Sequence, residues 1–202
     1  MSHDPSLFER SPGGGPREPS FKMSTRQLGV VVLFVSLSIL FLASLVGYAV
    51  TRLQNDLWRP PGSPGLPPGL FASTALLAGV SIAVHLALRS VRRNRLDSLV
   101  RSLWLTLAFA AAFLVGQTLN WHAMLAVPGL SSTLYAFTFY LLTGLHAVHV
   151  AAGFVPLGVV LARARRREYT SSHHEGVSFC VQYWDFLGVV WLVLLTTLHV
   201  FT

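Results

Sequence analysis

Charged side chains are scarce in this sequence and gather in a few short segments. Only 11% of the 202 residues are charged, whereas 52% are hydrophobic. No Asp, Glu, Lys or Arg lies between Arg26 and Arg52, between Arg59 and Arg89, or within 102–162. A membrane-spanning helix needs about 20 consecutive apolar residues. The uncharged runs therefore indicate a polytopic membrane protein.

Carboxylates are rarer still inside these runs, because Asp185 is the only one within 176–202 and the other runs have none. Carboxylate di-metal bundles need several inward Glu or Asp side chains. Proton or ion pathways usually need a chain of intramembrane ionisable groups. Neither set is present, so the chain has too little polar machinery to be a pump or an enzyme alone. The single cysteine, Cys180, excludes an internal disulfide framework.

The runs predict an all-α fold with five transmembrane helices. We place them near 28–50, 70–88, 102–121, 132–161 and 177–200. The sequence Val127-Pro128-Gly129 predicts the turn between the third and fourth helices. The fourth segment is longer than the hydrocarbon is thick, and Pro156 offers a kink within it.

Basic residues predict the orientation of the helices. Of the 15 Lys and Arg residues, only Arg52 and Arg59 fall between the first two helices, and the others alternate onto the opposite side. The positive-inside rule places the N-terminus in the cytoplasm and the C-terminus outside. The net charge of +7 thus reflects topology rather than nucleic-acid binding. Residues 1–25 are expected to form a disordered cytoplasmic tail, and residues 26–202 the transmembrane domain.

Two histidines, His146 and His149, share one face of the fourth helix. A bis-histidine haem needs imidazoles from facing helices at one depth. No other histidine matches the depth of His146, so haem binding requires a shifted helix. We favour a packing role, with Gly144 and nearby alanines allowing close helix approach while the imidazoles bond to a neighbouring helix or a lipid.

The C-terminal half resembles subunit III of the haem–copper oxidases. "TGLHAVHVAAG" (143–153) is similar to that family's T-G-x-H-x-x-H-V-x-x-G signature, and "SSHHEG" (171–176) and "YWDFLGVVWLVLL" (183–195) follow in the same order. Upstream, "RQLGVVVLFVS" (26–36), "STALLAGVSIAVHLAL" (73–88) and "FLVGQTLNW" (113–121) are similar to the earlier helices of the family. The likeness spans about residues 26–202 and matches the five-helix bacterial form.

This resemblance implies a non-catalytic subunit of a respiratory cytochrome c oxidase in the bacterial inner membrane. Such a chain binds no haem or copper itself, because these cofactors belong to the catalytic subunit beside it. Its expected partners are that catalytic subunit, subunit II and phospholipids. Lipid-contact or helix-packing roles are expected for residues of the two C-terminal signatures: Gly144, His146, His149, Gly153, Tyr183, Trp184, Asp185 and Trp191.

Several positions depart from the family pattern. Leu37 and Asn120 stand where the family commonly has glutamates, Asp185 stands in a histidine position, and Gly188 stands in an aspartate position. These departures place the family's role in proton uptake in doubt. Three alternatives stay open: an accessory subunit of a nitric oxide reductase, a small b-type cytochrome, and a lipid-handling membrane protein.

Overall fold

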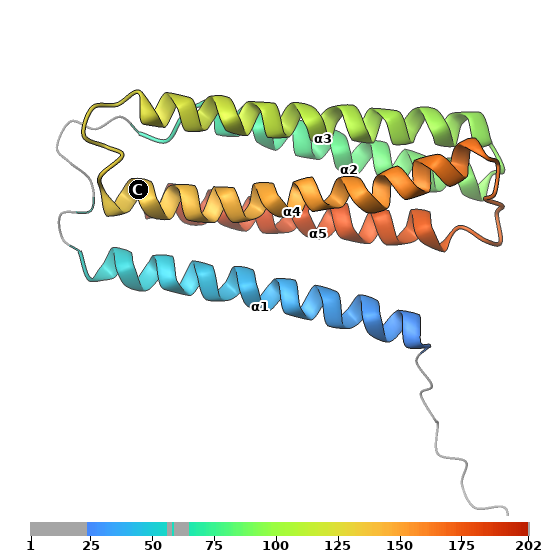
Figure 1. The fold of residues 1–202 in the computed structure, drawn as a ribbon, viewed down its shortest axis with the longest axis horizontal. Helices are drawn as coiled ribbons and strands as arrows, with labels where there is room; N and C mark the ends of the chain where they lie inside the picture. Colours follow the sequence, from blue (N-terminus) through green and yellow to red (C-terminus); the bar gives the residue numbers. More distant parts are fainter. Residues whose placement is uncertain (1–23, 56–57, 59–64, 202) are drawn as a thin grey trace, which may run out of the picture. The chain divides into compact units, whose positions relative to one another are not determined.

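A computed structural model describes residues 24–55, 58 and 65–201 of the chain. Within them lie five α-helices: α1 (Thr25–Leu53), α2 (Gly69–Arg92), α3 (Leu96–Leu125), α4 (Leu134–Arg165) and α5 (Glu175–Val200) (Figure 1). All five are long and apolar enough to cross a membrane. The expected tail up to residue 23 and loop residues 59–64 lie outside the described part of the chain.

The five expected helices are confirmed, and most extend beyond their apolar runs. The end of α2 continues from Leu88 to Arg92, and α3 begins at Leu96 rather than Ser102. Arginine is a good helix former whose long side chain reaches away from an apolar surface. Asp97 in the first turn of α3 also complements the helix dipole. The helices therefore continue into the basic segments that flank the apolar runs.

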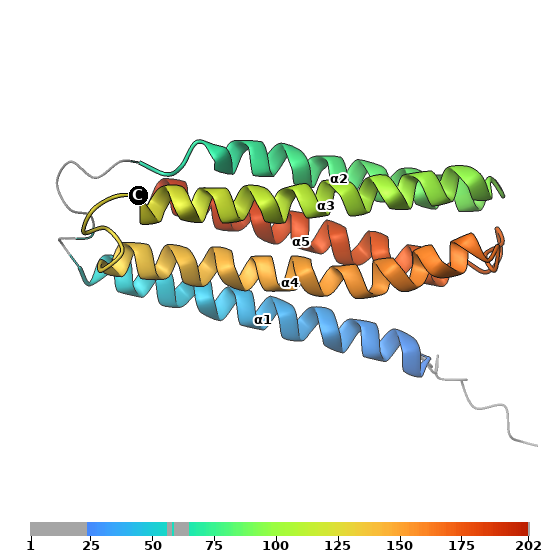
Figure 2. The same cartoon turned by 45° about the horizontal axis from the view of Figure 1, so that its top comes forward.

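The chain divides into two compact units, residues 1–40 and residues 41–202. In the second unit, α2 packs against α3 and α5, and α4 packs against the same two helices. The four helices form a closed ring around a shared core (Figures 1 and 2). The part of α1 from Phe41 onward belongs to this unit. There, the Tyr48 and Trp58 rings lie 5.5 Å apart, and Arg52 Nε donates to the Phe201 carbonyl at 3.0 Å.

The turn predicted at 127–129 is confirmed between α3 and α4. Gly129 adopts a φ of 74°, a left-handed conformation that glycine reaches without strain. Thr133 then caps α4, because its hydroxyl accepts a hydrogen bond from the Ala136 backbone N–H at 3.2 Å. Farther along, α4 runs through Pro156 without ending. At about 1.5 Å per residue, its 32 residues are longer than the ~30 Å hydrocarbon layer.

The α2–α3 and α4–α5 loops meet at the other end of the ring. Asn94 Oδ1 accepts a hydrogen bond from the Ser171 backbone N–H at 2.9 Å, and the Arg167 guanidinium lies 3.4 Å from Asp97. Asn94 and Arg167 both have positive φ values, 53° and 58°, which turn the chain sharply after each helix. The two arginine-rich loops are thus held together at one end of the molecule.

Among the glycines of α4, Gly153 and not Gly144 lies close to a neighbouring helix. A Cβ on Gly153 would lie 2.8 Å from Tyr183 Cε1 and 3.0 Å from Trp184 Cζ2, whereas a Cβ on Gly144 would meet nothing within 4 Å. Nine residues at about 100° each place these two glycines on opposite faces of α4. Among the described residues, the close approach expected at Gly144 is made at Gly153 instead. A packing role of Gly144 against lipid or a partner helix stays a prediction.

We predict that Gly153→Leu destabilises the α4–α5 contact, since its side chain would displace two buried rings. The expected loss in the free energy of unfolding is about 2 kcal/mol. The matched control is Gly144→Leu on the same helix, which should change stability little. Unfolding of the purified chain in detergent, followed by circular dichroism, measures both. Equal losses for the two variants would contradict the assignment of faces.

Candidate functional site

His146 lies at the centre of the ring and is completely buried. Its imidazole is surrounded by aromatic side chains, with ring centroids 5.2 Å from Trp191, 5.7 Å from Phe113 and 6.2 Å from Phe41. Within the described part of the chain, neither ring nitrogen has a hydrogen-bond partner. The imidazole thus fills space between rings from α1, α3 and α5 and joins no other helix by a hydrogen bond.

His149 occupies a different environment one turn along α4. Its Nδ1 lies 2.7 Å from the Leu145 carbonyl of the same helix, and its ring lies 5.1 Å from Phe41. The bond between helices at this level comes from α5, where the Tyr183 hydroxyl donates to the His149 carbonyl at 2.8 Å. The His149 backbone, and not the imidazole that the sequence had suggested, therefore links α4 to α5.

Trp191 and Trp184 anchor α5 within the same core. Trp191 is 1% exposed, and its indole Nε1 donates to the Thr74 hydroxyl of α2 at 3.0 Å. Its ring also meets Phe113 edge-on at 5.1 Å. Trp184 is equally buried and packs against Phe154 of α4. The signature residues of α5 thus contact both neighbouring helices.

Asp185 has two partners on α2 that sequence reasoning missed. The Ser81 hydroxyl donates to Asp185 Oδ1 at 2.7 Å, and His85 Nε2 lies 3.4 Å from Oδ2. His85 Nδ1 in turn lies 2.9 Å from the Ser81 carbonyl. The four-residue spacing of Ser81 and His85, which places both on one face of α2, was the signal in the sequence. This Ser81–His85–Asp185 cluster joins α2 to α5, yet Asp185 keeps 38% of its side-chain surface exposed.

A second polar cluster joins α2 to α3. Asn120 Nδ2 donates to Gln117 Oε1 at 3.0 Å and to the Ser73 hydroxyl at 3.3 Å. All three side chains are buried. Asn120 occupies one of the positions where a glutamate was expected from the family pattern, and here its amide acts as a hydrogen-bond donor. The cluster therefore depends on N–H groups that a carboxylate does not have.

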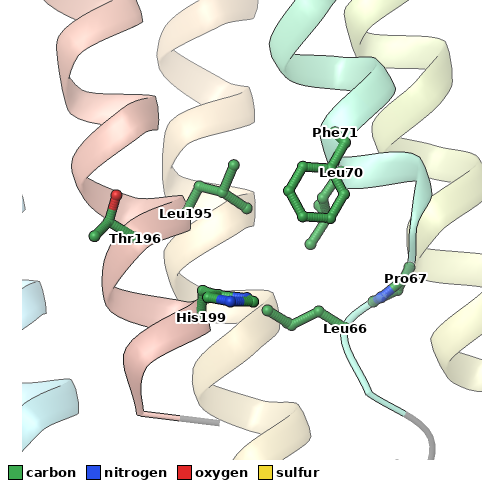
Figure 3. A pocket seen from close by; sticks show the side chains of 7 residues that line it. All are labelled: Leu66, Pro67, Leu70, Phe71, Leu195, Thr196 and His199. Carbon is green, nitrogen blue, oxygen red and sulfur yellow. The ribbon is translucent and has the colours of Figure 1, made fainter.

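A small pocket opens between the start of α2 and the end of α5 (Figure 3). Its volume is about 190 Å³, and its walls are mostly apolar. His199 reaches across it from α5 toward Leu66. The lining residues are Leu66, Pro67, Leu70, Phe71, Leu195, Thr196 and His199. The described residues hold no group of three or more His, Cys, Asp or Glu side chains that could bind a metal ion.

Five helices of membrane-spanning length, four of them joined in a ring by aromatic and hydrogen-bonded contacts, define a multi-pass membrane protein. The family model for cytochrome c oxidase subunit III matches residues 20–202. The chain therefore belongs to the cytochrome c oxidase subunit III family.

Curated relatives agree with this assignment. A cytochrome c oxidase subunit 3 from Thermostichus vulcanus is 30% identical over 181 residues, covering 88% of each chain. One from Synechocystis sp. is 34% identical over 173 residues, covering 84% of this chain and 72% of the relative. Another from Corynebacterium diphtheriae is 27% identical over 173 residues, covering 83% and 84%. The similarity thus extends across nearly the whole described structure.

We predict that the shape of the His146 ring matters more than its nitrogens. His146→Ala should lower the free energy of unfolding by about 3 kcal/mol, because it leaves a cavity between three aromatic rings. His146→Phe keeps a flat ring and should cost less than about 1.5 kcal/mol. Chemical unfolding in detergent compares the variants. A Phe variant as unstable as the Ala variant would show that the imidazole nitrogens are required.

We also predict that Asn120→Asp destabilises the α2–α3 contact. The carboxylate cannot donate to Ser73 or Gln117, and the expected cost is at least about 2 kcal/mol. Asn94→Asp is the matched control, because the shorter of its two bonds uses the side-chain oxygen as acceptor. Thermal unfolding should separate the two variants, and similar melting temperatures would argue against the donor role of Asn120.

Proposed function

We propose that this chain is a non-catalytic integral-membrane subunit of a respiratory haem–copper oxidase and that it stabilises the catalytic subunit. The family match over residues 20–202 carries this proposal. The core agrees with it, because His146 is enclosed by Phe41, Phe113 and Trp191 and is used in packing. The haem and copper of the reaction then belong to the catalytic subunit, and subunit II is the second protein partner.

The proposed orientation places the arginine-rich end of the ring in the cytoplasm. The α2–α3 and α4–α5 loops lie together there, joined by Asn94 with Ser171 and by Arg167 with Asp97. Cytoplasmic loops carry an excess of Lys and Arg. The C-terminal end of α5 would then face outward across a bacterial inner membrane. Exposed arginines at the cytoplasmic end also suit contact with phospholipid headgroups.

Purification of the tagged chain from its native membrane in a mild detergent tests the proposal. We expect a haem–copper catalytic subunit and subunit II to co-purify, with a haem absorption spectrum and oxygen consumption driven by reduced cytochrome c. The tagged chain expressed alone, without its partners, is the control and should have no Soret band.

Three other outcomes would contradict the proposal. Co-purification with a nitric-oxide-reducing enzyme would move the chain to an accessory role in that complex. A Soret band from the chain alone, lost in His146→Ala, would make it a b-type cytochrome. A chain recovered without any haem protein would remove the oxidase role while leaving the fold intact.

A further inference from the structure

The outer surface of α2 and α5 carries a regular stripe on each helix. The spacing alternates between three and four residues, which is the repeat that keeps one seam of a helix turned toward a neighbouring helix. These side chains are at least partly exposed. On α2 the stripe is Phe71, Ala75, Ala78, Ile82, His85 and Arg89, and on α5 it is Gln182, Asp185, Val189, Leu192, Thr196 and His199. We call these two stripes together the α2–α5 face.

Asp185 is the one carboxylate among the residues of this face. It lies ten residues from the start of α5 at Glu175, or about 15 Å at 1.5 Å per residue. Because α2 and α5 both extend past their apolar runs, the depth of Asp185 within the hydrocarbon is smaller than this length, and Arg89 follows its partner His85 by about one helical turn. Ser81 and His85 bond to the carboxylate from one side, while 38% of the Asp185 side chain stays exposed. A half-exposed carboxylate at this depth is costly unless a further donor or cation reaches it.

The mostly apolar pocket of Figure 3 lies on the same face. Thr196 in its wall follows Asp185 by 11 residues, which is three helical turns plus about 20°. The two residues therefore lie along one line of α5, separated by about 16 Å. Leu70 and Phe71 of α2 close the pocket from the other side. Its volume of about 190 Å³ suits a single large side chain rather than a whole ligand.

We infer that the α2–α5 face binds one transmembrane helix of the haem-carrying partner subunit. That helix places a hydrogen-bond donor or a cationic side chain opposite Asp185 and an apolar side chain in the pocket, about 11 residues away. Ala75 and Ala78 leave room for its backbone to approach α2 closely. This inference rests on the proposed function, and it adds the face, the chemistry and the spacing of the contact.

Two other occupants fit the face less well. A phospholipid brings an anionic phosphate to the face, where the Asp185 carboxylate repels it. A second copy of this chain, inserted in the same orientation, would place two Asp185 carboxylates at one depth, where like charges repel. A partner helix that carries a hydrogen-bond donor or cation can bind the Asp185 carboxylate and also pack along the two stripes.

Site-specific photocrosslinking in the native membrane tests which occupant is present. We would replace Val189 and Thr196, one at a time, with p-benzoylphenylalanine, and use Val115 on the exposed side of α3 as the background control. Both positions should crosslink to one helix of the haem-carrying subunit, with at least about tenfold more product than Val115. Products with lipid alone or with a second copy, or partner products no stronger than those of Val115, would overturn the inference.

Retention of the partner by variants provides an independent test. Asp185→Leu and Thr196→Phe should each lower the amount of haem protein recovered with the tagged chain by about tenfold. Val115→Phe is the control for adding a ring to an exposed position and should retain the partner. Among the described residues, the Thr196 hydroxyl bonds to the Leu192 carbonyl of its own helix, so Thr196→Phe adds a ring at the wall of the pocket without removing a contact between helices.

The variant outcomes separate this inference from the proposed function. If Asp185→Leu unfolds, Thr196→Phe still decides the question, because its helicity and melting temperature should match those of the unsubstituted chain. Full recovery of the partner by a folded Thr196→Phe variant would overturn the inference and leave the proposed function intact. Failure of the unsubstituted chain to recover any haem protein would instead contradict the proposed function.

Discussion

Polar groups within hydrocarbon must find partners inside the protein, and the ring of α2–α5 depends on this constraint. Each of its four helix contacts has at least one hydrogen bond that crosses it. The crossing bonds are Asn120 to Ser73 between α2 and α3, Ser81 to Asp185 and Trp191 to Thr74 between α2 and α5, Trp121 to Thr143 between α3 and α4, and Tyr183 to the His149 carbonyl between α4 and α5. Because apolar side chains give helices little reason to prefer each other over lipid, these bonds select the neighbours.

His146 has a packing role, because other groups make the hydrogen bonds between the helices. Trp191, whose indole bonds to Thr74, also packs its ring against the imidazole at an angle of 37°, and Phe113 meets the imidazole edge-on. The same tryptophan therefore links α5 to α2 and forms part of the aromatic surroundings of His146. The two histidines of the signature are thus unequal. His146 is buried in the core. His149 lies at the edge of the core, and its backbone carbonyl accepts a hydrogen bond from Tyr183 of α5.

The positions of the helices could be predicted from the sequence, but the faces by which they contact one another could not. Runs of apolar residues and the turn at Gly129 depend on local chemistry, so five spans and the 127–129 turn could be predicted. Which face of α4 meets α5 depends on neighbours that are distant in the chain. For this reason the sequence could not show that Gly153, on the face opposite Gly144, makes the close approach to α5. The partners of Asp185 were missed for the same reason, since Ser81 precedes it by 104 residues.

Asp185 departs from the family pattern in a way that the structure makes chemically consistent. The pattern has a histidine at this position, whereas here the carboxylate is on α5 and the imidazole of His85 faces it from α2. The carboxylate and the imidazole face each other across this contact and give α2 and α5 a polar link. Both side chains remain partly exposed on the outer surface. The exposed part of Asp185 lies along the same line of α5 as Thr196 and the pocket. A second helix packed along this line would contact both.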